Sequence, residues 1–442
     1  MGARGRSTLL GVAIAVALAD SSVVTLALPD VLRRYDVSIT TVAWVLTAFN
    51  LALALAAVPA ARLAHRAPRA VFAAGVAVFA GASLACGVAP SFAALVAARA
   101  VQAAGAAGLV AAALSLLAAC EGSQERAAHV WARAGVLGAA LGPAAGGLLT
   151  QLLGWESIFL VQAPLLPATL AALPRLRVSR PVAVPSGRPH RAANAALLLA
   201  SAALSAALFL LVVLLVDGWS LDPAAAGLVA TAMPVAALAA ARVARREQGA
   251  GASAAAGLVL VAGGLAALGL LPHAGWTWTL APQALVGCGL GLTVAALTRQ
   301  ALRGRSPLAV HGGWTIASRH AGVVLGLLLL TPLFAAQLDR NETEAKRAGT
   351  AILLDSRIAP LDKLRLAQDV LRRVERADGR LPDVRPAFAG RDDPEARRVA
   401  GALQDQLERA VTSAFGPPFL LAAGLAALAL VAVALGRREA GL

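Results

Sequence analysis

The chain has 442 residues, of which 59% are hydrophobic and 14% are charged, and its formal net charge is +15. A soluble protein carries about 25% charged residues, so this composition favours an integral membrane protein. The positive charge does not indicate a nucleic-acid partner, because the arginines cluster in short segments between long apolar runs. We therefore expect the lipid bilayer to surround the chain and no nucleic acid to bind it.

Twelve apolar runs of about 20 residues follow one another, each long enough to cross a bilayer core as an α-helix. The first run is too long for the apolar part of a signal peptide, so we interpret it as a true span. The pattern predicts an all-α integral membrane protein with twelve transmembrane helices in two six-helix bundles. The expected limits are 8–29, 40–61, 70–89, 92–118, 131–153, 157–174, 194–216, 223–243, 252–272, 276–298, 308–337 and 415–436.

The arginines predict the orientation, because cytoplasmic loops carry an excess of basic residues. With the N-terminus in the cytoplasm, twenty arginines fall in cytoplasmic segments, whereas the short outer loops hold only Arg33 and Arg34. We therefore expect a multi-pass protein of the inner or plasma membrane with both termini in the cytoplasm.

The runs divide into two halves that echo each other, as in many secondary transporters. Residues 60–66 and 240–246 share five of seven positions. The Gly138-x-x-x-Gly142 pair of the fifth run also has a counterpart in the eleventh. The expected parts are 1–176 (N-terminal six-helix bundle), 177–193 (cytoplasmic linker), 194–337 (first five helices of the C-terminal bundle), 338–414 (extracytoplasmic helical insert) and 415–442 (last transmembrane helix and cytoplasmic tail).

The insert differs from the rest of the chain, with fifteen basic and fourteen acidic residues between Asp339 and Thr412. In "LDKLRLAQDVLRRVERA" the apolar residues share one helical face, and in "DDPEARRVAGALQDQLERAV" they recur every four. Asp393 is the expected N-cap of the second helix, with Pro394 and Glu395 in its first turn. We expect a small helical cap that is available to an extracytoplasmic partner; the alternative is a solvated spacer.

A single carboxylate, Asp20, lies near the centre of the first run, in "AVALADSSVVTLALP". An ionised acid at mid-span costs about 2.5–3.5 kcal/mol on insertion scales, so intramembrane acids usually have a function. Arg99 is the expected partner, because both residues lie roughly 10–14 Å from the outer side. A pair that protonation loosens suits a proton-coupled transporter. The alternative is an ion pair that only fixes helix packing.

Several segments match known motifs. "LADSSVVTLALP" is similar to L-D-x-T-V-V-N-x-A-L-P, with Ser22 for threonine and Thr25 for asparagine, and "LVAARAVQAAGAAG" is similar to L-x-x-x-R-x-x-Q-G-x-G. "GAALGPAAGG" matches G-x-x-x-G-P-x-x-G-G in full. Together they resemble the drug:proton antiporter branch of the major facilitator superfamily. The resemblance implies that Asp20 carries protons with Arg99 as its modulating partner. It also implies a hinge and a seam between the halves at Gly138, Gly142, Pro143, Gly146 and Gly147.

The loop after the second run departs from the family pattern G-x-L-A-D-R-x-G-R. Here it reads "ARLAHRAPR", with His65 where the family has aspartate. In the family this loop latches the cytoplasmic side, so His65, Arg66 and Arg69 are the expected cytoplasmic gate, without its usual acid.

The eleventh run places Arg319 near mid-span in "TIASRHAGVVLG", which resembles a T-A-R-Q-L-G segment. Arg319 either meets an anionic substrate or lipid headgroup, or it bonds backbone carbonyls at a helix break near Gly322. Asn50 and Gln102 are further expected cavity residues.

We predict a proton-coupled secondary transporter that exports a small amphipathic compound by alternating access. One alternative is an exporter of a lipid or cell-envelope precursor that uses the insert, and another is a non-transporting membrane scaffold or receptor. The sequence shows no nucleotide-binding loop, metal-ligand spacing or nucleophilic triad, so we expect neither an enzyme nor a cofactor or metal. The expected partners are protons and a small-molecule or lipid substrate.

Overall fold

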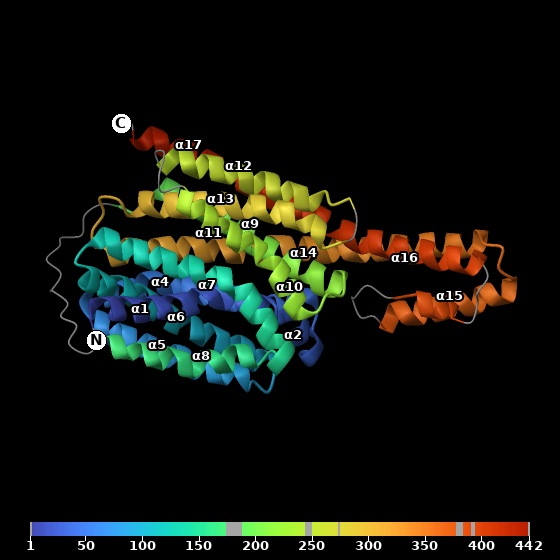
Figure 1. Ribbon diagram of the computed structural model, residues 1–442, viewed down its shortest axis with the longest axis horizontal. Helices are drawn as coiled ribbons and strands as arrows, with labels where there is room; N and C mark the ends of the chain where they lie inside the picture. The colour runs from blue at the N-terminus through green and yellow to red at the C-terminus, as the bar shows by residue number, and fades with distance from the viewer. Residues whose placement is uncertain are drawn as a thin grey trace.

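The computed structural model describes residues 2–173, 188–243, 250–272, 275–376, 383–389 and 394–440. The described residues form helices that run nearly parallel along the long axis (Figure 1). The N-terminal half comprises α1 (Ala3–Thr25), α2 (Leu28–Tyr35), α3 (Ile39–Val42), α4 (Trp44–Arg66), α5 (Pro68–Gly87), α6 (Phe92–Glu121), α7 (Gln124–Leu153), α8 (Ser157–Ala168) and the 3₁₀-helix η1 (Thr169–Ala172).

The second half begins after the expected linker, most of which lies outside the described residues. Its elements are α9 (Arg191–Val213), the π-helix η2 (Leu214–Gly218), α10 (Pro223–Ala230), α11 (Ala232–Val243), α12 (Ala250–Gly269), α13 (Thr277–Leu302), α14 (Leu308–Asp355), α15 (Pro360–Arg376), the 3₁₀-helix η3 (Arg385–Phe388), α16 (Pro394–Ala414) and α17 (Gly416–Ala440).

Local sequence signals explain where several helices begin and end. The side chains of Ser91 and Ser123 accept hydrogen bonds from the backbone at the starts of α6 and α7. Pro68 and Pro223 occupy the first turns of α5 and α10, where a missing N–H costs nothing. Gly122 closes α6 with a φ of 63°, a left-handed conformation that glycine adopts freely.

Eleven helices among the described residues are long and apolar enough to cross a membrane. The sixth expected span is shorter: the apolar stretch Ser157–Ala172 consists of α8 and η1. Pro164 and Pro167 lie inside α8 and withhold two backbone donors, which is a physical reason for its early change to a 3₁₀ turn.

The two halves repeat the same packing. In the N-terminal half α1 packs on α7, α4 on α6 and α5 on α8; in the C-terminal half α9 packs on α14, α11 on α13 and α12 on α17. Across the halves, α4 packs on α14 and α10 packs on α7. The weak internal echo of the sequence therefore corresponds to a real structural repeat.

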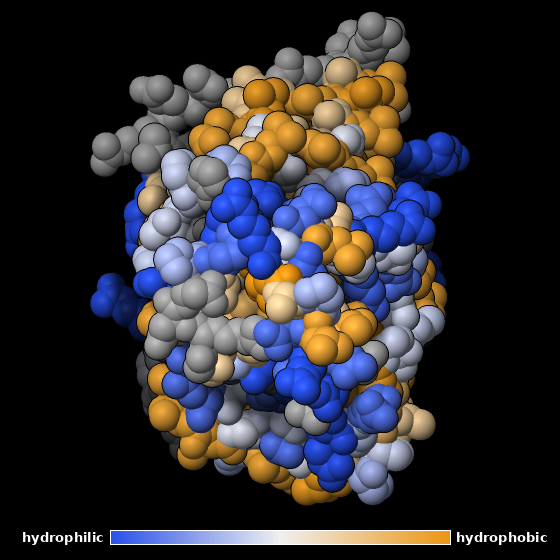
Figure 2. Space-filling model, turned by 90° about the vertical axis from the view of Figure 1, so that its right-hand side faces the viewer, coloured by the Kyte–Doolittle hydropathy of each residue, from blue (hydrophilic) through white to orange (hydrophobic). Residues whose placement is uncertain are grey.

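The molecule has two distinct ends. At the terminus end lie both chain ends and the turn after α6, where Ser7 Oγ donates to Glu121 Oε1 at 2.5 Å (Figure 1). At the opposite end, the 48-residue α14 continues beyond the bundle, and α15 and α16 fold beside it (Figure 1). We call the extension of α14 with α15 and α16 the hairpin, and this end of the molecule the hairpin end. Seen from that end, hydrophilic residues gather over the centre (Figure 2).

The expected insert is helical, as predicted, with one correction. Val399 and Leu403 of α16 are buried in a small separate core, as their spacing predicts, and Pro394 starts the helix. The expected N-cap Asp393 lies outside the described residues. On α15 the expected apolar face is only partly buried: Val370 packs against this core, but Leu361 is 74% exposed and Leu364 is 62% exposed, because the helix packs mainly through Leu366.

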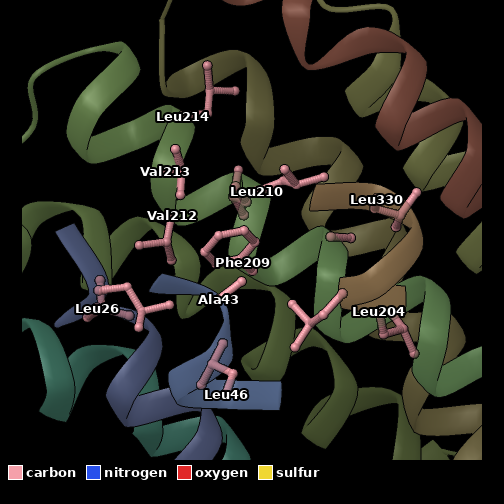
Figure 3. Close-up of a cluster of buried hydrophobic side chains, with 14 of the residues drawn as sticks. Leu26, Ala43, Leu46, Leu204, Phe209, Leu210, Val212, Val213, Leu214 and Leu330 are labelled. Carbon is pink, nitrogen blue, oxygen red and sulfur yellow. The ribbon is translucent and has the colours of Figure 1, made fainter. Parts of the chain in front are cut away.

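The hydrophobic core differs between the two ends. Toward the hairpin end, one cluster joins both halves, with Leu26, Ala43 and Leu46 of the first half close to Phe209 and Val212 of the second (Figure 3). Toward the terminus end, one cluster fills the N-terminal half and also includes Ile316 of α14, and a second, smaller cluster lies within the C-terminal half. The halves therefore share a large hydrophobic core at the hairpin end, whereas at the terminus end the first half is contacted by α14, next to α4 and α6.

Candidate functional site

Asp20 of α1 and Arg99 of α6 form a buried ion pair. Arg99 Nη1 donates to Asp20 Oδ2 at 2.5 Å, and both side chains are 0% exposed. This contact confirms the predicted partnership. Taking two charges out of water is costly, and close geometry with additional hydrogen bonds is required to offset that cost.

Further contacts hold the Arg99 guanidinium in place. Nε donates to the carbonyl of Val45 at 3.2 Å, and Nη1 donates to Gln102 Oε1 at 2.5 Å. The guanidinium carbon lies 4.2 Å from the centre of the Phe49 ring and 5.5 Å from that of Phe159, which are distances of cation–π contacts. Nη2 is buried with no hydrogen-bond partner among the described residues. Arg99 therefore keeps other partners when Asp20 changes its charge.

Gln102 is the centre of a polar network, not an open cavity residue. It is 0% exposed, and its Nε2 lies 2.8 Å from Ser83 Oγ, 3.3 Å from Gln162 Oε1 and 3.4 Å from Asp20 Oδ1. Neither Ser83 nor Gln162 was among the site residues expected from the sequence. Each is a polar residue in an apolar helix, a signal that could have identified them.

Asn50 of α4 joins the two halves. Its Nδ2 donates to the carbonyl of Leu46 at 2.8 Å and lies 3.4 Å from Ser21 Oγ. Its Oδ1 lies 2.7 Å from Nδ1 of His320, a residue of α14 in the other half. In this arrangement His320 Nδ1 is the donor. Asn50, expected in a cavity, is instead 0% exposed and lies in the contact between the halves, next to the residue that follows Asp20.

Arg319 lies in the uninterrupted helix α14. The helix runs through Gly322 without a break, so the predicted alternative of a bond to broken-helix carbonyls is wrong. Among the described residues the Arg319 side chain has no ion-pair or hydrogen-bond partner. It is half-buried.

The glycines of α7 divide into two sets. A Cβ at Gly138 would clash with the carbonyl of Ala15 in α1, and one at Gly142 or Gly146 would also meet α1. Only a Cβ at Gly147 would clash with the other half, at the carbonyl of Pro223 in α10. The expected seam between the halves is therefore corrected: three of the four glycines pack inside the N-terminal half.

The other half repeats this packing and also touches Pro143. Gly322 and Gly326 of α14 lie against backbone carbonyls of α9, as Gly138 and Gly142 lie against α1. Across the halves, the backbone carbonyl of Pro143 approaches Gly227 of α10. Pro143 lies inside a continuous α7, so the seam at the hairpin end consists of Pro143 and Gly147 against α10.

The expected cytoplasmic gate lies between α4 and α5. Arg69 Nη2 donates to the carbonyl of Leu173 at 2.9 Å, a contact within its own half. Neither His65 nor Arg66 has a hydrogen bond or ion pair among the described residues. Close contact with the other half is instead made one turn earlier, where Gly313 of α14 packs on Ala61.

A cavity of 1680 Å³ opens at the terminus end between the halves. The start of α7 contributes to one side of it, and the ends of α9, α12 and α13 contribute to the other. No group of three potential metal ligands occurs in the part of the chain that the structure describes. The site is thus a buried charge network between a closed end and an open cavity.

Comparisons with known proteins agree with this architecture. The family model of the Major Facilitator Superfamily matches residues 10–327. The chain is 37% identical over 180 residues to the tetracenomycin C resistance and export protein of Streptomyces glaucescens, covering 39% of this chain and 33% of that protein. It is 35% identical over 244 residues to the methylenomycin A resistance protein of Streptomyces coelicolor, covering 54% and 49%. These alignments span about a third to a half of the relatives' length.

The fold also resembles a solved structure. A bacterial homolog of the human lysosomal transporter Spinster, in an inward-facing and unoccupied conformation, superposes with a TM-score of 0.64 at 15% identity, and the match covers 98% of both chains. At this identity the similarity concerns the fold alone.

Proposed function

The chain belongs to the Major Facilitator Superfamily, a family of membrane transporters and not of enzymes, and from this we propose that it is a proton-coupled exporter of a small amphipathic compound. The observation that carries the proposal is the fully buried Asp20–Arg99 pair. A carboxylate inside a membrane-spanning helix needs a partner or a proton, so it can exchange one for the other. Protons would enter the cytoplasm through Asp20 while the substrate leaves.

The network around the pair provides two states for such a cycle. When Asp20 is ionised, Arg99 is shared between Asp20 and Gln102. When Asp20 takes up a proton, the attraction to Arg99 weakens, and Arg99 retains its bonds to Gln102 and Val45. Because Arg99 contacts Val45 on α4, and α4 packs on α14 of the other half, a change at the pair can influence the packing between the halves.

Alternating access requires each end to open and close in turn. The shared hydrophobic cluster at the hairpin end and the cavity at the terminus end support a form that is open toward the cytoplasm, given the orientation predicted from the arginines. The contact that would part when the hairpin end opens is the seam of Gly147 with α10, and Gly313 keeps α14 against α4 in the present form.

The variant Asp20→Asn tests the proposal. In proteoliposomes with a pH gradient, the wild type should move at least one of two fluorescent amphipaths, the anion dansylglycine or the cation dansylcadaverine. Asp20→Asn should abolish the gradient-dependent part, whereas Asp405→Asn on the exposed surface of α16 should leave it unchanged. Gradient-driven transport at the wild-type rate by Asp20→Asn would contradict the assignment.

A second candidate is export of a lipid or cell-envelope precursor. The observation that favours it is the apolar stripe on α15, where Leu361, Leu364 and Leu371 are 74%, 62% and 45% exposed. An exposed stripe of this kind suits a hydrophobic cargo or an extracytoplasmic partner at the hairpin. Lipid that co-purifies with the wild type but not with Leu361→Gln/Leu364→Gln would support this candidate, and equal lipid content would count against it.

A further inference from the structure

Arg319 places a positive charge deep in the C-terminal half. It lies eleven residues from the start of α14 at Leu308, which corresponds to about 16 Å, or roughly the middle of a bilayer core. A cation at this depth is costly unless it faces a partner or a wet cavity. Among the described residues of the first half, Asp20 is the only buried acid in a span, and it is already paired with Arg99.

Helix periodicity identifies the face that Arg319 occupies. Gly322 packs on α9 and Gly313 packs on α4, so these two residues mark the neighbours of α14. At about 100° per residue, Arg319 lies about 60° from Gly322 and about 120° from Gly313, between the two packed faces. The opposite side of the helix carries Trp314 and Leu328, which are 38% and 50% exposed, as expected of a lipid-facing surface. The half-buried Arg319 therefore faces the interior between the halves.

The cavity at the terminus end is also strongly basic. Its lining includes five arginines and one carboxylate: Arg188, Arg191, Arg299, Arg303, Arg305 and Glu125. The preference for basic residues in cytoplasmic loops explains their side of the membrane. It does not require five of them to line the same side of one cavity, opposite the start of α7. A cavity with one sign of charge and low-dielectric walls raises the local concentration of oppositely charged ligands.

From these two observations we infer that the exported compound is an organic anion, whose carboxylate, sulfonate or phosphate group pairs with Arg319 after entering through the basic cavity. The inference rests on the proposed function and adds the charge of the substrate to it. The substrate supplies the counter-ion that the protein lacks at this position, because Arg319 has no ion-pair or hydrogen-bond partner among the described residues. The same chemistry would hold the headgroup of an anionic phospholipid.

Equilibrium binding of three probes with the same fluorophore tests the charge preference. Dansylglycine is an anion, dansylamide is neutral and dansylcadaverine is a cation. We expect purified wild-type protein in nonionic detergent to bind dansylglycine roughly tenfold more tightly than dansylamide, the value of one charge-assisted hydrogen bond. Arg319→Gln should remove this preference, Arg319→Lys should retain part of it, and Arg347→Gln, an exposed arginine of the same helix, should retain all of it.

The outcomes separate this inference from the proposed function. Equal binding of the three probes, no binding of the anion, or an unchanged preference in Arg319→Gln would overturn the inference. Gradient-driven export of dansylcadaverine alone would uphold proton coupling while overturning the anion preference. Binding of dansylglycine in nanodiscs separates the two sources of the anion. Weaker binding in phosphatidylglycerol nanodiscs than in phosphatidylcholine nanodiscs means that the anionic lipid competes for the site, which assigns the site to a lipid headgroup. Equal binding in both kinds of nanodisc assigns the site to a free anion.

Discussion

Replacing Arg99 by leucine should destabilise the protein more than any other single change in the site. The variant would leave the Asp20 carboxylate 0% exposed, with only the 3.4 Å contact from Gln102 Nε2. Removing one partner of a buried ion pair typically costs about 3–5 kcal/mol, because the other charge remains without compensation. Asp20→Asn should cost less, about 1–3 kcal/mol, since Arg99 keeps its bonds to Gln102 and Val45.

The double variant Asp20→Asn/Arg99→Leu isolates the interaction between the two residues. It removes both charges together, so it should be more stable than the sum of the single effects predicts. We expect a coupling energy near the upper part of the range of about 0.5–3 kcal/mol observed for residues in contact. Arg347→Leu on the exposed part of α14 is the control for losing an arginine, with an expected effect within about 0.5 kcal/mol.

Equilibrium unfolding in mixed micelles of dodecyl maltoside and dodecyl sulfate measures all four variants. If Arg99→Leu were no more costly than Asp20→Asn, or if the two effects simply added, the reasoning from the buried pair would be refuted.

Two glycines of α7 should respond differently to the same substitution, because they face different helices. Gly138→Val should lower the yield of folded protein, since the new side chain meets the backbone of α1 within the N-terminal half; normal yield and stability would contradict the packing. Gly147→Val should fold but fail to close at the hairpin end, since the new side chain meets α10 of the other half; cysteine labelling at that end should rise, and unchanged labelling would contradict the assignment of the seam.

The sequence was sufficient for the all-helical membrane fold and for the Asp20–Arg99 pair. Both depend on quantities that can be read along one chain, namely the length of apolar runs and the depth of a charge in its run. The polar network around the pair could not be predicted from the sequence. Ser83, Gln162 and Asn50 meet their partners only because α5, α8 and α14 pack beside the pair, and helix spacing within one segment carries no information on that packing.

Hydropathy also placed the end of the eleventh helix too early. The apolar run stops near residue 337, where charged residues begin, but α14 continues to Asp355. Leaving the bilayer changes which side chains are tolerated and does not interrupt the backbone hydrogen bonds of the helix. Pairs such as Lys346 with Glu342, at 2.6 Å and four residues apart, suit a solvated helix.

The two proposals together have an electrical consequence. If one proton enters as one monovalent anion leaves, two positive charges in effect move inward in each cycle. Each charge gains about 2.3 kcal/mol per 100 mV of inside-negative potential. At about 60 mV and equal pH on both sides, dansylglycine should reach an outside-to-inside ratio of roughly one hundred, since each 1.4 kcal/mol corresponds to a factor of ten.

A potassium gradient with valinomycin sets this potential in proteoliposomes, and the distribution of dansylglycine at steady state gives the ratio. Asp20→Asn is the matched comparison, because it removes the proposed proton carrier and leaves Arg319 in place. A ratio of only about ten in the wild type would mean that the anion leaves without a proton, so that Asp20 does not couple the two movements. A ratio of one in the wild type would contradict both the coupling and the anionic substrate, because two charges moving inward cannot be indifferent to the potential.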